Sequence, residues 1–472
     1  MNNFRKSACT SILIGKAATT DGSVIIGRNE DCRAAWPKHY VVHPRKRFNH
    51  SEYHSKANGF KIKLPKLRMK YDATPEWTDQ FGTFEEDGIN EANVAMSATE
   101  SADANEAVLG ADPLVKDGIG EEAMVTVVLP YVKSAREGVA RLGQIIESHG
   151  TSEVNGVLFA DANEAWYLET GSGHQWVAER IPDNCYAVVA NQLAIQKVDF
   201  NDHHDFMWSP NLRKFVSQNH LNPAQDHSFN FRLIFGTRTL ADTYYNTPRV
   251  WYGHRMFSPQ NHSEPQSQSL NFVMKSSQKL SVQDAEAFLS SHYQGTKYDP
   301  LGHTKERHRF RPVSLAKTQE SHVLQIRPDV PKEISGIHWL AMGVAAQSTY
   351  VPFFSGITTT PDEYHRGKHL YQTDSAYWIF KLAGILVDAH YPEFSPELKR
   401  VQKQLQIHYL NSIHHADAKI KSIPQAKRTA LVNSVSQQNA SAAMSAYRKL
   451  AAQLITRSTD DSPLNYHQDP NL

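Results

Sequence analysis

The stretch CTSILIGKAATTDGSVIIGRNED, residues 9–31, determines the fold that the sequence predicts. Two short runs rich in β-branched residues flank the turn dipeptide Asp21-Gly22, a pattern typical of a β-hairpin. With a loop of two residues, Thr20 pairs with Ser23. We therefore predict that this stretch forms two adjacent antiparallel strands.

The same register predicts which side chains share a face of the hairpin. Gly15 would face Arg28, so odd positions of the first strand share a face with even positions of the second, and Cys9 lies on the side of Arg28. The apolar residues on the face of Cys9 and Arg28 are Leu13, Val24 and Ile26, and those on the other face are Ile12, Ile14 and Ile25. A hairpin that is apolar on both faces is expected at the centre of a layered structure. Asp31 has the opposite parity and reaches Cys9 only if the chain curls after Arg28.

The composition excludes several classes of protein. The chain has 472 residues, Lys+Arg 50 against Asp+Glu 49, and 40% hydrophobic residues, which is typical of a globular protein with a sizeable core. The near-neutral charge disfavours nucleic-acid binding, even though residues 38–70 are basic. We find no apolar run of membrane-spanning length, and residues 1–8 are too short and polar for a secretory signal, so we expect a cytoplasmic protein without membrane attachment.

Strand-like and helical patterns are mixed along the rest of the chain, which predicts an α+β protein. Strand patterns lie at 89–97, 156–159, 165–169, 186–190 and within 320–354, and helical patterns lie near 120–149 and after about 374. The histidine pairs, His203 with His204 and His365 with His369, lack the HExxH spacing of a zinc hydrolase. We therefore expect neither a metal nor another cofactor.

Cys9 is the first candidate for chemistry, although a free cysteine is more often a small buried apolar residue. Cleavage after Ala8 would place a thiol and an α-amine on one residue. The pKa of such an amine is about 7.7–8.0, against about 10.4 for lysine, so it can take the thiol proton near neutral pH. Arg28 would lower the pKa of the thiol, and Asp31 would hold the amine. The alternative is that Arg28 and Asp31 form an ordinary ion pair at a strand end.

The two other cysteines, Cys32 and Cys185, are expected to be packing residues, because neither becomes a chain start. Three cysteines cannot form a disulfide framework.

Further motifs are DGINEANVAMSATES at 87–101, VVANQ at 188–192, SPNLRKF at 209–215, YNTPRVWYG at 245–253 and TYVPFF at 349–354. With residues 9–31, they resemble the secernin-related cysteine dipeptidases of the N-terminal-nucleophile (Ntn) hydrolase superfamily. The resemblance implies an α+β fold, a four-layer αββα Ntn-hydrolase sandwich of two antiparallel sheets, to which the helical pattern adds a C-terminal extension. The expected organisation is a leader at 1–8 that is removed on maturation, the αββα domain at 9–395, the helical extension at 396–457 and a flexible tail at 458–472.

The resemblance also implies roles for individual residues. Cys9 matches the nucleophile, and Arg28 and Asp31 match the arginine and aspartate beside it. Asn191 matches an asparagine that holds the oxyanion. Arg249 is the candidate for a second arginine, with Arg213 as the alternative.

The sequence departs from the wider amidase pattern at SATES, where Thr99 or Glu100 stands in place of a further oxyanion asparagine. This leaves the second oxyanion donor open and favours a polar, zwitterionic substrate. Glu30 or Glu100 would bind the ammonium of such a substrate, and Arg249 its carboxylate. The resemblance thus predicts a cysteine dipeptidase acting on small peptides, expected to be a homo-oligomer. The alternatives are an Ntn amidase for another small acylated amine and a non-catalytic homologue that keeps its leader.

Overall fold

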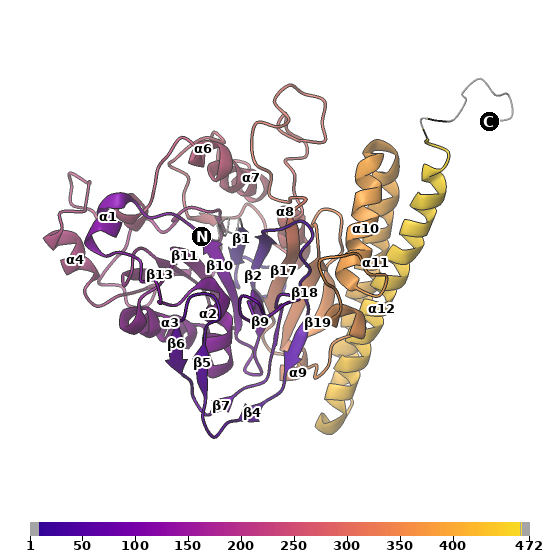
Figure 1. The fold of residues 1–472 in the computed structure, drawn as a ribbon, viewed down its shortest axis with the longest axis horizontal. Helices are drawn as coiled ribbons and strands as arrows, with labels where there is room; N and C mark the ends of the chain where they lie inside the picture. The colour runs from indigo at the N-terminus through magenta and orange to yellow at the C-terminus, as the bar shows by residue number, and fades with distance from the viewer. Residues whose placement is uncertain (1–8, 463, 465–472) are drawn as a thin grey trace.

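Two antiparallel sheets form the centre of the molecule (Figure 1). The structure is a computed structural model and describes residues 9–462 and 464. The seven-stranded sheet has the order β16-β14-β1-β2-β17-β18-β19, and the six-stranded sheet has the order β15-β13-β12-β11-β10-β9.

The bounds of the seven-stranded sheet are β1 (Thr10–Ile14), β2 (Val24–Asp31), β14 (Cys185–Val189), β16 (Val273–Lys275), β17 (Thr318–Ile326), β18 (Gly336–Met342) and β19 (Val351–Phe354). Those of the six-stranded sheet are β9 (Asp87–Ile89), β10 (Ala95–Ser101), β11 (Asn155–Ala160), β12 (Ala165–Thr170), β13 (Trp176–Ile181) and β15 (Phe206–Trp208). Short ribbons pair β3 (Val41–His43) with β8 (Tyr71–Ala73), β4 (Lys46–Arg47) with β7 (Leu67–Arg68) and β5 (Glu52–His54) with β6 (Lys61–Lys63).

The helices are α1 (Glu106–Ala111), α2 (Glu121–Val128), α3 (Ala135–His149), α4 (Leu212–Gln218), α5 (Phe231–Phe235), α6 (Asp242–Tyr245), α7 (Thr247–Phe257), α8 (Val282–Leu289), α9 (Lys332–Ser335), α10 (Ala376–Ala389), α11 (Tyr391–Ile420) and α12 (Gln425–Ser458). Two 3₁₀ turns are η1 (Leu129–Tyr131) and η2 (Asp362–His365). No helix in the described part of the chain is both long and apolar enough to cross a membrane.

The sheets pack face to face, and helices cover their outer faces (Figure 1). Leu13, Ile26 and Leu324 of the seven-stranded sheet share one apolar core with Leu158 and Tyr167 of the other. Helices α2 and α3 bury their apolar sides against the six-stranded sheet. Helices α8 and α10 to α12 belong to the core on the far side of the seven-stranded sheet. The predicted mixture of helices and antiparallel strands, with a helical C-terminal region, is therefore confirmed.

The N-terminal hairpin exists and lies at the centre of its sheet, but its register differs from the predicted one by four residues. Ile14 pairs with Ile25, and Ser11, rather than Gly15, pairs with Arg28. The loop is longer because it is held by distant parts of the chain: Gly15 N–H donates to the Cys185 carbonyl (2.9 Å). An even shift preserves parity, so the predicted division of apolar residues between the two faces is correct.

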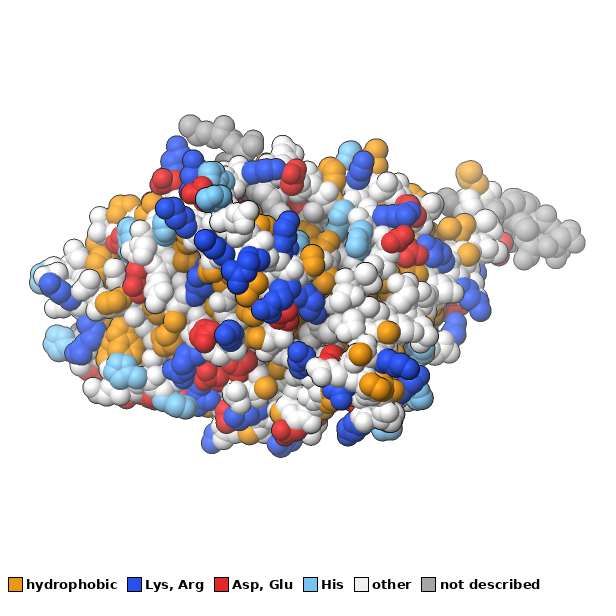
Figure 2. Space-filling view, turned by 90° about the horizontal axis from the view of Figure 1, so that it is seen from below, with side chains coloured by type: hydrophobic (Ala, Val, Ile, Leu, Met, Phe, Trp, Pro, Cys, Tyr) orange, Lys and Arg blue, Asp and Glu red, His pale blue; other side chains and the backbone are white. Residues whose placement is uncertain are grey.

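The basic segment around residues 38–70 folds into the short ribbons. Figure 2 shows Lys and Arg side chains gathered over the middle of the face on which these ribbons lie, with acidic side chains among them. The segment is therefore a mixed-charge surface.

The C-terminal helices begin where the helical pattern starts, with α10 at Ala376. Helix α11 begins at Tyr391, before the predicted boundary at 396, and continues through Pro396. Both α11 and α12 share a continuous apolar core with the seven-stranded sheet. The predicted leader, residues 1–8, and most of the predicted tail lie outside the described residues.

Candidate active site

The thiol of Cys9 lies between an arginine and a carboxylate supplied by the neighbouring strand. Cys9 immediately precedes β1 and is fully buried. Arg28 Nη1 donates a hydrogen bond to Cys9 Sγ (3.0 Å), and Sγ donates to Glu30 Oε2 (3.3 Å). Arg28 and Glu30 alternate along β2 and therefore lie on one face, as the hairpin parity predicts.

Arg28 joins the two sheets at this point. Its Nε donates to Ser97 Oγ (3.1 Å), Nη2 to the Ala98 carbonyl (2.8 Å) and Nη1 to the Thr99 carbonyl (2.9 Å), all on β10. Nη2 also pairs with Glu86 Oε2 (2.6 Å). Because the guanidinium is fully buried and bonded on every nitrogen, its position beside the thiol is fixed.

The pKa of the Cys9 thiol is raised overall, although Arg28 itself lowers it as predicted. Burial raises the pKa of the Cys9 thiol, and Glu30 raises it further. Arg28 acts in the predicted direction, but its effect is the smaller one. Neither the burial of the thiol nor the carboxylates that accompany Arg28 could be predicted from the local sequence. The thiol is therefore protonated near neutral pH and requires a base to become a nucleophile.

Arg249, on α7, connects Cys9 to Asn191. Its Nη1 donates to the Cys9 carbonyl and to Thr10 Oγ1 (2.8 Å), and its Nη2 donates to Asn191 Oδ1 (2.8 Å). The remaining bonds, to Asn246 Oδ1 and the Tyr245 carbonyl, occupy the rest of the guanidinium. The structure thus brings Cys9, Arg249 and Asn191 together, whereas Arg213 lies over the Phe200 ring.

Asp31 lies on the opposite face of β2 from Arg28, because the two positions differ in parity along the strand. Its carboxylate accepts hydrogen bonds from Arg311 Nη2 (2.5 Å) and from Thr318 Oγ1. Arg311 Nη1 in turn donates to Thr10 Oγ1 (3.1 Å). Asp31 is therefore linked to the residue after Cys9 through Arg311, which the sequence analysis did not single out.

The SATES segment contacts both β1 and Arg28. Ser11 Oγ donates to Glu100 Oε2 (2.5 Å), and burial raises the pKa of Glu100 to about 7 although Arg249 opposes this. Thr99 Oγ1 is buried without a hydrogen-bond partner among the described residues. Its hydroxyl is thus a candidate for the second oxyanion donor.

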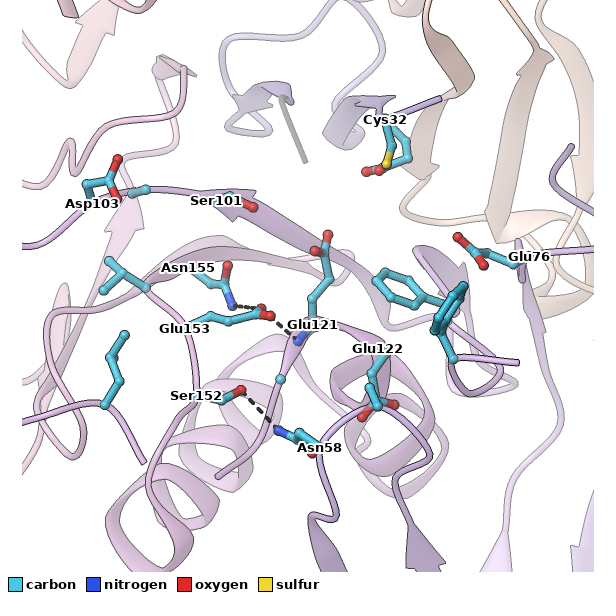
Figure 3. Close-up of a pocket in the computed structure, with 18 of the residues that line it drawn as sticks. Cys32, Asn58, Glu76, Ser101, Asp103, Glu121, Glu122, Ser152, Glu153 and Asn155 are labelled. Carbon is cyan, nitrogen blue, oxygen red and sulfur yellow. Dashed lines mark hydrogen bonds between the residues drawn. The ribbon is translucent and has the colours of Figure 1, made fainter. Parts of the chain in front are cut away.

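An acidic cavity of about 410 Å³, shown in Figure 3, includes in its wall Glu30, the residue bonded to the Cys9 thiol. Its acidic wall residues are Glu30, Glu76, Asp103, Glu121, Glu122 and Glu153. Glu30 both lines this cavity and accepts the Cys9 hydrogen bond, so it links the thiol to the cavity wall. Asn191 lines a second cavity of about 770 Å³, which shares Ser101, Asp103 and Ala104 with the first.

Two buried carboxylate clusters near the site are paired with the protein's own cations. Glu86 pairs with Arg28 and, through Oε1, with Lys38 Nζ (2.5 Å). His322 Nδ1 lies 2.8 Å from Asp87 and 3.0 Å from Glu320, and its Nε2 lies 2.9 Å from Ser97 Oγ. This second cluster therefore contacts Arg28 through Ser97.

Sequence reasoning missed Glu86, Ser97, Glu121, Asn155 and Arg311 as residues of the site. Glu86 and Ser97 lie in or beside the quoted DGINEANVAMSATES motif, so that motif carried a signal for them. The pair Glu121-Glu122 looks like an ordinary helix start, where acidic residues are common.

Comparison with known proteins gives the class to which the site belongs. The model of a family of peptidases matches residues 8–404, which covers the hairpin, Asn191 and Arg249. The chain belongs to peptidase family C69. It is 44% identical to the "Probable dipeptidase" of Latilactobacillus sakei over 99% of this chain and 98% of that relative. It is 42% identical to the "Probable dipeptidase B" of Lactococcus lactis subsp. lactis over 84% of each chain, and 37% identical to the "Dipeptidase A" of Lactobacillus helveticus over 89% of this chain and 90% of the relative.

Proposed function

We propose that this protein is a dipeptidase in which Cys9 is the nucleophile and its α-amine, released by removal of residues 1–8, is the base. The names of the relatives support dipeptide hydrolysis. The observation that carries the proposal is that two buried arginines hold Cys9, one at its thiol and one at its carbonyl, beside an acidic cavity. We further propose that the two packed sheets and their helices are the αββα sandwich of the Ntn hydrolases.

The mechanism follows from the state of the thiol. Because burial and Glu30 keep the thiol protonated, Arg28 alone does not generate the nucleophile, and the α-amine takes the proton. The thiolate attacks the peptide carbonyl, and Asn191 stabilises the oxyanion. The amine then passes the proton to the leaving amino group, and a thioester forms. Water hydrolyses the thioester with the same amine as base.

A dipeptide carries a charge at each end, and the site must match both. The sequence suggested Arg249 as the residue that binds the substrate carboxylate. The N–H groups of Arg249, however, already donate to protein acceptors. Among the described residues that line the acidic cavity, Arg33 is the basic one. We therefore assign the substrate carboxylate to Arg33.

Intact-mass measurement together with a dipeptide assay tests the proposal. The active wild-type preparation should begin at Cys9, and Cys9→Ala should lose hydrolysis, whereas Cys185→Ala, at a thiol on β14, should keep it. An active protein that retains residues 1–8 would contradict the role of the amine. Turnover of N-acyl amino acids but not of dipeptides would instead favour the amidase, and an inactive full-length chain would favour the non-catalytic homologue. A cytoplasmic, homo-oligomeric state completes the proposal, and light scattering on the purified protein measures the oligomer.

A further inference from the structure

Two buried hydrogen-bond acceptors on the wall of the acidic cavity lack a partner among the described residues. They are Glu121 Oε1 and Asn155 Oδ1. The Glu121 residue is 6% exposed and Asn155 is 0% exposed. Leaving such an acceptor unpaired costs about 1–3 kcal/mol, so a buried pair of them facing one cavity indicates a ligand that supplies donors.

Glu153 contacts both residues and orients the side-chain amide of Asn155. Its Oε2 accepts from the Glu121 backbone N–H (3.3 Å) and from Asn155 Nδ2 (3.2 Å). Because the amide N–H of Asn155 faces a carboxylate, the assignment of its oxygen to the other side is secure. Figure 3 shows the Glu121 side chain extending from the start of α2 into the cavity, with Glu153 and Asn155 beside it.

Glu121 is also the carboxylate of its cluster that no protein cation approaches closely. Carboxylate oxygens of Glu30, Glu86 and Glu121 lie within 4.8 Å of one another. Arg28 lies 2.5 Å from Glu30, and Lys38 lies 2.5 Å from Glu86. From Glu121 Oε1, however, Arg28 Nη1 is 3.9 Å away, which is beyond hydrogen-bond distance. Burial, together with Glu86, Glu30 and Glu153, raises the pKa of Glu121, and a ligand cation bound beside it would favour its charged form.

The distance from this carboxylate to the thiol suits a dipeptide. Arg28 Nη1 lies 3.0 Å from Cys9 Sγ and 3.9 Å from Glu121 Oε1. The distance between Cys9 Sγ and Glu121 Oε1 is therefore at most the sum of these two distances. In a dipeptide, the α-nitrogen is joined to the scissile carbonyl carbon by two bonds of about 1.46 and 1.52 Å. A carbonyl about 3–3.5 Å from Sγ thus brings the ammonium within reach of Glu121.

We propose that Glu121 and Asn155 bind the free α-ammonium group of the dipeptide, an inference that rests on the proposed function. The three N–H donors of an ammonium match the two unpaired acceptors and the carboxylate of Glu153 next to them. A substrate with an acylated amine would leave these acceptors unpaired, so the site selects peptides with a free amino terminus.

Binding of an uncleavable analogue tests the subsite independently of catalysis. The probe is a dipeptide analogue whose scissile amide is replaced by a methylene ether, together with its des-amino counterpart, titrated calorimetrically into the purified full protein. The wild type should bind the amino form about 10- to 100-fold more tightly than the des-amino form, as expected for a hydrogen bond to a charged group. Glu121→Gln should remove this preference while leaving the affinity for the des-amino form unchanged.

Glu122→Gln is the matched control for the loss of one carboxylate at this cavity. Both oxygens of Glu122 already accept hydrogen bonds, from Tyr53 and Ser55, so this variant should keep the preference for the amino form. Asn155→Ala should weaken the preference in part. An unchanged preference in Glu121→Gln, or an equal loss in Glu122→Gln, would overturn the assignment. A wild type that binds the amino form through Glu121 but hydrolyses no dipeptide would keep the subsite and reject the proposed function.

Discussion

Asn191→Ala should reduce turnover far more than it reduces substrate binding. Asn191 Nδ2 carries two N–H groups, and one of them donates to the Ser101 carbonyl (3.0 Å). The second N–H is left for the oxyanion, while Arg249 holds Asn191 Oδ1 and the Cys9 carbonyl on one guanidinium. Removing one oxyanion donor costs about 100- to 1,000-fold in kcat, or about 2.7–4 kcal/mol. KM should change little, because the charge develops only in the transition state.

Asn246→Ala is the control that distinguishes stabilisation of the oxyanion by Asn191 from its support of the Arg249 side chain. Asn246 Oδ1 accepts from the same Arg249 Nη2, and at the same distance of 2.8 Å, as Asn191 Oδ1 does. Both variants therefore loosen the guanidinium, but only Asn191→Ala removes the N–H that the proposed mechanism assigns to the oxyanion. Steady-state dipeptide hydrolysis is measured for each variant after intact mass has shown that the leader is removed. Equal losses of kcat in the two variants would refute the oxyanion role of Asn191.

Three further outcomes follow from the charges around the site. Arg28→Met should lower the free energy of unfolding by about 3–5 kcal/mol, because Glu30 and Glu86 lose their buried partner, and adding Glu86→Gln should recover part of the loss in denaturant titrations. Burial lowers the pKa of His322, but Asp87 and Glu320 outweigh it and raise that pKa to about 8, so this stabilisation is complete below about pH 6.5 and is lost as the pH rises through about 8. Chemical denaturation at several pH values should therefore show a shallower alkaline loss in His322→Gln than in the wild type; equal slopes would contradict it. Arg33→Met should raise KM for a dipeptide but not for the dipeptide amide, and an equal rise for both would remove Arg33 from the carboxylate site.

The local parity of the hairpin could be predicted, whereas its register could not. Parity depends only on alternation along each strand, and a shift of four residues preserves it, so Arg28 and Glu30 fall on the predicted face. The register depends on the loop, and the loop is held by partners far along the chain. Thr20 N–H, for example, donates to the Leu280 carbonyl (2.9 Å). Such contacts cannot be predicted from the sequence of the hairpin itself.

The residues of the site also divide into those that could be predicted from the sequence and those that could not. Residues near Cys9 in the sequence were found from the pattern, and Asn191 and Arg249 were found from the resemblance. Arg311 and Asn155 were not found, because they reach the site only when distant segments pair, as Ser101 and Asn155 do in β10 and β11. Asp31 was given a role beside the amine, but its carboxylate is held by Arg311 on the opposite face of β2. That role stays a prediction for the protein whose leader has been removed.

The carboxylates around Cys9 have opposite effects before and after substrate arrives. Burial together with Glu30, Glu100 and Glu121 raises the pKa of the thiol and keeps it protonated. An ammonium bound at Glu121 would place a positive charge near the thiol, which favours the thiolate. Substrate binding would then promote formation of the nucleophile, and an empty site would remain unreactive. The thiolate absorbance should therefore increase when the uncleavable amino analogue binds to the wild type, but not when the des-amino form binds. An equal increase with both forms would show that exclusion of water, rather than the ammonium charge, controls the thiol.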